Sequence, residues 1–175
     1  MFGFKKRQLI SVTLVFVLLS SFTVSNRLMK KMLKEIETTF NAKEVKLISL
    51  ELNKEQLIIH EKDHFFKIEK NNQLLGYAYL GKAASKTDEF DYLILIDTDL
   101  IIKKTKILIY REDYGGEIGS KRWLKQFIGK SAKDELLYEK DIIAISGATI
   151  SATSMTKAVN AFLKNISILK ENKVL

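Results

Sequence analysis

A cluster of small and hydroxyl side chains directly precedes an expected amphipathic helix, and it consists of Ser146, Gly147, Ala148, Thr149, Ile150 and Ser151. The first backbone N–H groups of a helix have no partners within the helix and lie at the positive end of its dipole, so an anion is stabilised there. Gly147 and Ala148 would let another group approach the backbone closely. The cluster therefore predicts a phosphate site with Thr149 beside the anion.

The same cluster is also typical of an ordinary helix start. Ser151, Thr153 and Ser154 are each possible N-caps. The helix is predicted from apolar residues that recur at helical spacing, namely Met155, Val159, Phe162, Leu163, Ile166 and Leu169. The residues alone leave both interpretations open.

Ser146-Gly147-Ala148-Thr149, with Ser151 after it, resembles the flavinylation motif of the FMN-binding domain family. That family includes the C subunit of the sodium-pumping NADH:quinone oxidoreductase and the G subunit of the Rnf electron-transport complex. The resemblance implies that Thr149 carries FMN through a phosphoester bond. It also implies a dedicated flavin transferase that uses FAD and magnesium.

The residues before the motif follow the order of the same family. Tyr110 is followed by Glu112, Asp113, Tyr114 and Gly115, where the family usually has a segment resembling Glu-Thr-Pro-Gly; the Asp-Tyr pair departs from that pattern. An expected helix follows, with Trp123, Leu124 and Phe127 on one face and then Gly129. The resemblance covers about residues 72 to 169 and implies that Glu112 to Gly115 contact the flavin together with Ser146 to Ser151. Tyr110 and Tyr114 are candidates to cover the isoalloxazine, whereas Trp123 is expected in the core.

The chemistry expected at Thr149 needs outside help, because a threonine hydroxyl is a poor nucleophile unless a base activates it. Nothing near Thr149 in the sequence supplies a base, which favours attachment by a separate transferase. The bound phosphate would then meet the backbone or hydroxyl groups of Gly147, Ala148, Ile150 and Ser151. We expect an electron carrier that works as a redox subunit rather than as a self-sufficient enzyme.

Two other functions stay open. The first is a membrane-tethered binding or assembly domain of the same fold that carries no flavin, which the changed Asp113-Tyr114 pair favours. The second is a hydrolase that uses Ser146 or Thr149, although the Gly-x-Ser-x-Gly elbow and a nearby histidine are missing.

The N-terminus predicts a membrane anchor. Lys5, Lys6 and Arg7 precede an apolar run from residue 9 to 24, and the charge-free stretch from residue 8 to 26 is just long enough to cross a bilayer. The leading positive charges predict a single pass in the cytoplasmic membrane, with the following domain outside the cytoplasm. The partners expected are therefore the lipid bilayer, membrane redox proteins and the flavin transferase.

A cleaved signal peptide is the alternative, since Thr23 and Ser25 are small enough for the positions before a cleavage site. Apolar residues continue at helical spacing directly afterwards, which favours an uncleaved anchor and a stalk or amphipathic helix over residues 27–43. These residues are Leu28, Met29, Met32, Leu33 and Ile36. Residues 44–175 are then expected to form one extracytoplasmic FMN-binding domain.

Composition excludes several kinds of site. The chain of 175 residues has no cysteine, which excludes disulfides, thiolate metal sites and cysteine nucleophiles. Residues 1–40 carry five of the eight net positive charges, and no base-reading motif accompanies the rest, so no nucleic-acid partner is expected. His60 and His64 are expected in strand and turn context at the solvent edge, and Asp97 and Asp99 are expected in a turn, so no metal site is predicted.

The remaining pattern predicts an α+β domain with a twisted, largely antiparallel sheet and helices packed against it. Strands are expected over residues 45–52, 56–60, 65–70, 74–80, 92–96 and 101–110, with turns at Asn71-Asn72 and Asp97 to Asp99. A short helix is expected over residues 120–128, and a charged connection over residues 130–140 leads to a final strand or turn.

Overall fold

The computed structural model describes residues 24–52, 57–58 and 62–175. Most of the predicted anchor lies outside these residues, and so do His60 and most of the strand predicted over residues 56–60. Within the part of the chain that is described, no helix combines the length and the apolar character needed to span a bilayer.

Five antiparallel strands form one sheet in which neighbours along the chain are neighbours in space. They are β1 (Lys46–Ser49), β2 (His64–Lys70), β3 (Gln73–Ala84), β4 (Glu89–Asp97) and β5 (Ile102–Ile109). The β2–β3 turn is made by Asn71 and Asn72, whose φ angles of 51° and 61° suit a tight hairpin. The Asp97 carboxylate accepts the N–H groups of Asp99 and Ile101, each at 3.0 Å, so Asp97 forms the predicted turn.

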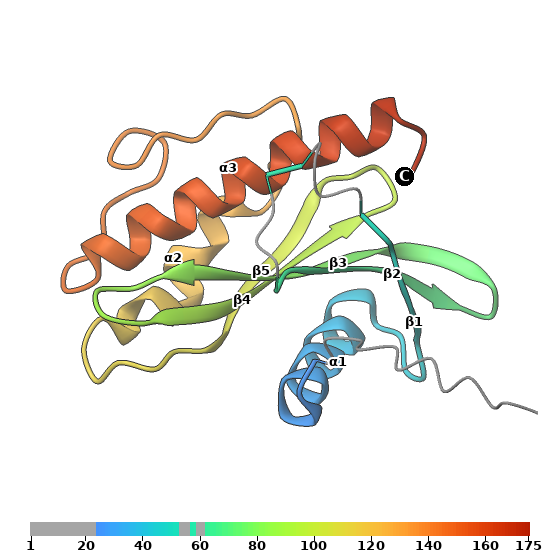
Figure 1. Ribbon diagram of the computed structural model, residues 1–175, viewed down its shortest axis with the longest axis horizontal. Coiled ribbons are helices and arrows are strands. Elements are labelled where there is room, and N and C mark those ends of the chain that lie inside the picture. Colours follow the sequence, from blue (N-terminus) through green and yellow to red (C-terminus); the bar gives the residue numbers. More distant parts are fainter. Residues whose placement is uncertain (1–23, 53–56, 59–61) are drawn as a thin grey trace, which may run out of the picture.

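Helices cover both faces of the sheet, as Figure 1 shows. The long helix α3 (Thr149–Glu171) lies across one face, and α1 (Asn26–Phe40) packs on the other. Strand β4 is buried on both sides because its side chains alternate between the two cores: Phe90, Tyr92, Ile94 and Ile96 join the α3 core, and Leu93 and Leu95 join the α1 core. The predicted α+β class with a largely antiparallel sheet is confirmed.

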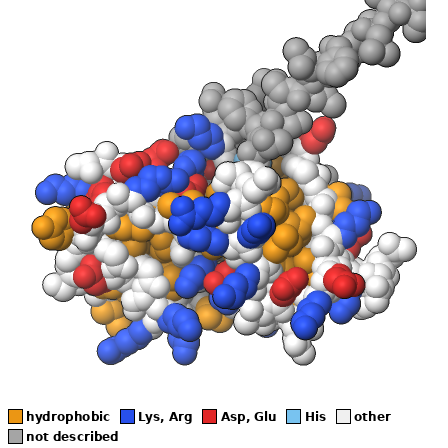
Figure 2. Space-filling view, turned by 90° about the horizontal axis from the view of Figure 1, so that it is seen from below, with side chains coloured by type: hydrophobic (Ala, Val, Ile, Leu, Met, Phe, Trp, Pro, Cys, Tyr) orange, Lys and Arg blue, Asp and Glu red, His pale blue; other side chains and the backbone are white. Residues whose placement is uncertain are grey.

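The segment expected to form a stalk or an amphipathic helix is α1. Its apolar stripe faces the sheet, and Met32 and Ile36 are fully buried there. Lys104 on β5 also pairs with Glu35 on α1 at 2.6 Å. Figure 2 looks at the molecule from this side and shows Lys and Arg side chains gathered over the middle of the face.

The helix predicted over residues 120–128 is shorter than expected. It consists of one α-helical turn, α2 (Lys121–Leu124), and the 3₁₀ turn η2 (Lys125–Phe127). A further 3₁₀ turn, η1 (Gly116–Gly119), precedes it. Trp123 and Phe127 nevertheless share one buried face, with ring centroids 5.2 Å apart. The Trp123 indole N–H donates to the Ile143 carbonyl at 2.7 Å, which ties the long connection before α3 to this segment.

Candidate functional site

A pocket of about 330 Å³ opens at the start of α3, and three segments far apart in the sequence line it. They are the β3–β4 turn, the loop after β5 and the residues around Thr149. The lining residues are Lys86, Tyr110, Glu112, Tyr114, Gly115, Gly147, Ala148, Thr149, Ile150 and Ser151. The pocket thus brings together every residue predicted for the site except Ser146 and Asp113.

Thr149 is the first residue of α3, and its side chain is exposed. Ala148 occupies the N-cap position and offers no side-chain hydrogen bond to the helix. The first backbone bond of the helix runs from the Ala152 N–H to the Ala148 carbonyl at 2.8 Å, so the N–H groups of the preceding residues come before the hydrogen-bonded ladder. This end of α3 can therefore accept an anion beside the Thr149 hydroxyl.

The N-caps predicted from the sequence are wrong. Ser151, Thr153 and Ser154 all lie inside α3, because the helix begins at Thr149. The Thr153 hydroxyl donates to the Thr149 carbonyl at 2.9 Å, which is a bond within the first turn. No described side chain caps the helix, so its N-terminal backbone is left for another partner.

Two glycines let the flanking loops approach each other. Gly115 and Gly147 have φ angles of 83° and 81°, in the left-handed region that favours glycine. A Cβ atom on Gly115 would lie 2.6 Å from the Tyr110 hydroxyl oxygen and 3.4 Å from the Gly147 carbonyl oxygen. Only glycine fits between these two walls of the pocket.

Tyr110 joins the end of β5 to the first turn of α3. Its hydroxyl lies 3.0 Å from the Ser151 hydroxyl, and its ring packs on Phe90 at 5.9 Å. Ser151 is buried and therefore supports the pocket wall from beneath. By contrast, the Tyr114 side chain is 87% exposed and stands at the rim.

Glu112 fixes the β3–β4 turn that carries Lys86. One carboxylate oxygen, Oε1, accepts the Thr87 N–H at 2.6 Å, the Ser85 hydroxyl at 2.7 Å, the Thr87 hydroxyl at 3.0 Å and the Asp88 N–H at 3.1 Å. These bonds, led by the Thr87 N–H and the Ser85 hydroxyl, lower the pKa of Glu112 from its ordinary 4.5 to about 2. Glu112 thus stays ionised and holds the turn, which places Lys86 at the pocket.

The pocket is suited to binding an anion rather than to activating a nucleophile. Lys86 and the start of α3 supply positive charge, while one oxygen of the Glu112 carboxylate, Oε1, is occupied by the turn. Among the described residues, no side chain hydrogen-bonds the Thr149 hydroxyl, and the Thr153 hydroxyl donates to the Thr149 carbonyl instead. Lys86 was not predicted, because its place at the pocket depends on a contact between residues 87 and 112 that no local pattern reveals.

The other singled-out residues lie elsewhere. Ser146 and Asp113 do not line the pocket, and Trp123 belongs to the α3 core as expected. His64 is half-buried on β2, away from this site. Within the described ranges, no group of three or more metal-binding side chains is found.

The residues present fit an FMN phosphate and a tethered flavin. An uncapped helix start, an exposed hydroxyl, a lysine and two glycines with positive φ angles meet in one open pocket. Exposed apolar and aromatic side chains, Ile150 at 52% and Tyr114 at 87%, flank it and offer surface for a ring system.

Comparison with known proteins also points to FMN. Residues 86–164 match the family model of the FMN-binding domain. The chain is 34% identical over 100 residues to the G subunit of the Na⁺-translocating ferredoxin:NAD⁺ oxidoreductase complex of Acetobacterium woodii. That match covers 51% of this chain and 48% of the relative, so the chain spans about half the length of the curated protein it matches.

The matched region contains β4, β5, the loop at Gly115, the Thr149 motif and most of α3. The resemblance read from the sequence is therefore confirmed. Residues 86–164 of this chain match the FMN-binding domain family, and the chain is similar to the G subunit of an Rnf-type complex.

Proposed function

We propose that this protein is a membrane-anchored electron carrier whose FMN is joined to Thr149 through a phosphoester. The observation that supports it most is the exposed Thr149 hydroxyl at the uncapped start of α3, inside a pocket lined by the family's glycines. When bound, the flavin supplies electron transfer, and the chain supplies position and environment.

The attachment is a transfer reaction that the chain does not catalyse alone. The Thr149 oxygen forms a bond to the phosphorus of the FMN half of FAD, the diphosphate bridge breaks, and AMP leaves. The hydroxyl proton passes to a base of the transferase, since no described side chain is hydrogen-bonded to the Thr149 hydroxyl. Covalent attachment then replaces a binding equilibrium with a permanent tether.

The residues around Thr149 have separate tasks in this proposal. The first turn of α3 and the Lys86 ammonium stabilise the phosphate charge. Gly115 and Gly147 give the phosphate and ring access to the backbone, and Tyr110 holds the loop against Ser151. Glu112 positions the turn that carries Lys86.

The proposed location follows from the N-terminal sequence and from the relative. A span over residues 8–26 with cytoplasmic Lys5, Lys6 and Arg7 would leave the domain at the outer face of the cytoplasmic membrane. The relative is a subunit of an oxidoreductase complex, which supports membrane redox proteins as partners of this chain.

The test is flavin fluorescence of the band on a denaturing gel after co-expression with a flavin transferase. We expect a fluorescent band for the native chain and for Thr149→Ser, which keeps a hydroxyl, and a dark band for Thr149→Ala. A dark native band, with the transferase active on a control substrate, would instead support a flavin-free binding or assembly domain.

A further inference from the structure

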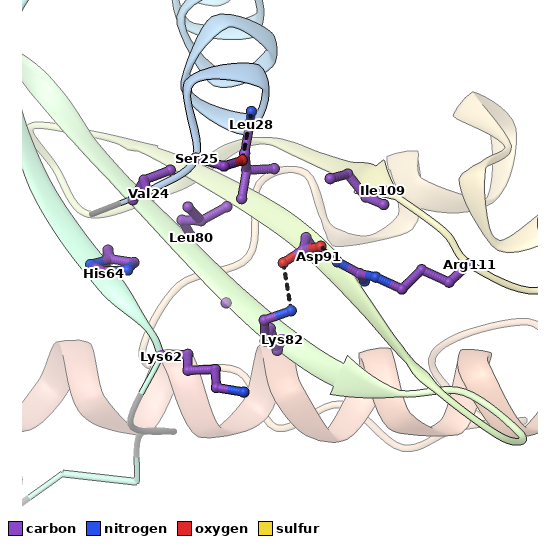
Figure 3. A pocket seen from close by; sticks show the side chains of 11 residues that line it. Val24, Ser25, Leu28, Lys62, His64, Leu80, Lys82, Asp91, Ile109 and Arg111 are labelled. Atoms are coloured by element: carbon purple, nitrogen blue, oxygen red, sulfur yellow. Dashed lines mark hydrogen bonds and ion pairs between the residues drawn. The ribbon is translucent and has the colours of Figure 1, made fainter. Parts of the chain in front are cut away.

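A second pocket, of about 250 Å³, lies on the opposite face of the sheet, where α1 begins. Figure 3 shows side chains from α1, from the sheet and from the segments flanking it pointing into this space. One wall is apolar and is made by Val24, Leu28, Leu80 and Ile109. The other wall is charged and is made by Lys62, Lys82, Asp91 and Arg111.

The charged wall is built around a buried carboxylate. Asp91 is 3% exposed, and it pairs with Lys82 at 2.9 Å and with the Arg111 guanidinium. Arg111 is fixed further by a 2.7 Å bond to the Glu89 carbonyl. These contacts hold two cations in a defined geometry near the β3–β4 turn end of the sheet, and Figure 3 shows the Lys82–Asp91 pair.

The pocket carries an excess of positive charge. Lys62, Lys82 and Arg111 face it with Asp91 as their acidic counterpart, so the lining residues leave two positive charges uncompensated. Only part of the Lys82 ammonium is used by Asp91, since an ammonium has three donors. A ligand with one negative charge and several acceptor oxygens would satisfy this wall.

The size and the two-sided lining restrict the ligand further. Pockets for drug-sized ligands measure about 300–1,000 Å³, so 250 Å³ suits a headgroup rather than a large cofactor. To contact the apolar wall, the ligand must also carry a hydrocarbon part next to its anionic group. A phosphate joined to a glycerol and the start of acyl chains has this composition.

The position of the pocket indicates the source of such a ligand. Val24 and Ser25 both line it. Val24 is the last residue of the apolar run from residue 9 to 24, and Ser25 follows that run directly. In a chain anchored by that run, the pocket lies where the chain leaves the bilayer. Phospholipid phosphates are concentrated at this level.

We propose that this pocket binds the phosphate headgroup of an anionic phospholipid, with Lys62 and Lys82 on the phosphate and the apolar wall on the first carbons. The proposal rests on the proposed function only for the membrane anchor. It requires no flavin, and it gives the domain a preferred orientation on the membrane.

The experiment uses the full chain, produced without transferase and purified in a neutral detergent. Native mass spectrometry counts bound lipid during titration with phosphatidylglycerol or phosphatidylcholine, and a parallel arm uses inorganic phosphate. The variants are Lys62→Gln and the double variant Lys62→Gln/Lys82→Gln. Lys157→Gln is the matched control, because it removes one exposed charge from α3 on the other face.

We expect saturable binding of phosphatidylglycerol that Lys62→Gln weakens roughly tenfold, while Lys157→Gln leaves it unchanged. The double variant should bind more weakly still, with an unfolding temperature that shows it is folded. Equal binding of both lipids, or equal affinity in all variants, overturns the proposal.

Binding of inorganic phosphate that equals or exceeds that of the lipid overturns the lipid as the ligand. Flavinylation is measured separately on co-expressed samples, and membrane anchoring by extraction of membranes. A failure of either is therefore distinguishable from a failure of this pocket.

Discussion

At the scale of single residues, the hydroxyl groups of Thr149 and Ser151 differ in their hydrogen-bond partners. Its hydroxyl has no hydrogen-bond partner among the described residues, while Ser151 two positions later is bound to Tyr110 at 3.0 Å. This difference separates two hydroxyls of the same motif. One is available for attachment, and the other supports the wall.

Glu112 gives a pH prediction. Its pKa is lowered to about 2 in the folded chain, so the folded state favours the ionised form relative to the unfolded state. Its stabilising contribution is present above about pH 4.5 and is lost as the pH falls toward 2. We expect Glu112→Gln to lower the unfolding temperature at pH 7 and to flatten its dependence on pH in that window.

Thermal unfolding followed by circular dichroism between pH 2 and pH 7 checks this expectation. Glu135→Gln is the control, because Glu135 is exposed and takes no part in the β3–β4 turn. If the unfolding temperature falls equally steeply with decreasing pH in the native chain and in Glu112→Gln, the role given to Glu112 is contradicted.

At the scale of elements, the loop after β5 tests how tightly the pocket walls meet. Gly115→Ala would strain a φ of 83° and place a Cβ 2.6 Å from the Tyr110 hydroxyl. Gly129 has a φ of 84° with nothing within 4 Å of a Cβ, so Gly129→Ala reports the backbone cost alone, about 1–2 kcal/mol. We expect Gly115→Ala to lower the free energy of unfolding by about 1–3 kcal/mol more than Gly129→Ala does.

Chemical denaturation measures both costs. Replacing Tyr110 by Phe in the Gly115→Ala background removes the clashing oxygen and should recover most of the difference. Equal costs for Gly115→Ala and Gly129→Ala would show that the loop does not press on Tyr110.

Helix α1 gives a second prediction at this scale. Ile36 is fully buried between α1 and the sheet, so Ile36→Ala should lower the free energy of unfolding by about 2–5 kcal/mol. Lys30→Ala, at an exposed position of the same helix, should change it by less than about 0.5 kcal/mol. Similar small effects of both changes in denaturant titrations would mean that α1 does not contribute to the folded core.

Local sequence patterns predict the helices and turns that are determined by residues close together in the sequence. The apolar spacing from Met155 to Leu169 predicts α3, and the Asn71-Asn72 pair predicts a hairpin. Strand β4 extends further than predicted because Asp91 interrupts the apolar run. Its carboxylate is tolerated in the sheet since Lys82 and Arg111 pair with it, and those contacts join residues far apart in the sequence.

The site is predictable to the same degree. The motif around Thr149 and the glycine at position 115 can be read directly, since each requires a residue type at one place. The start of α3 and the place of Lys86 cannot. Both depend on tertiary contacts. The Ser151 hydroxyl, a possible cap in the sequence, is hydrogen-bonded to Tyr110 instead. Lys86 lies in a turn that Glu112 fixes from 24 to 27 residues away.

At the scale of the whole molecule, the two pockets lie on opposite faces of the sheet. The pocket at Thr149 is at the start of α3, and the pocket lined by Lys62 and Lys82 is at the start of α1. In the proposed arrangement, the α1 face is turned toward the bilayer and the Thr149 pocket is presented to redox partners.

Membrane attachment is the prediction at this scale. The chain should stay in the membrane pellet after alkaline carbonate extraction, because a span over residues 8–26 is buried in lipid. Protease added to intact spheroplasts should digest the domain while a cytoplasmic marker survives. Release by carbonate or protection from protease would contradict the anchor or its direction.

The central claim is tested most directly by mass spectrometry of the peptide from Asp141 to Lys157, which trypsin releases from the denatured chain. After co-expression with a flavin transferase, we predict a peptide heavier by one FMN less water, with fragment ions that place the group on Thr149. An unmodified peptide, or a flavin on Ser146, Ser151 or another hydroxyl, from cells in which the transferase modifies a control protein would contradict the account.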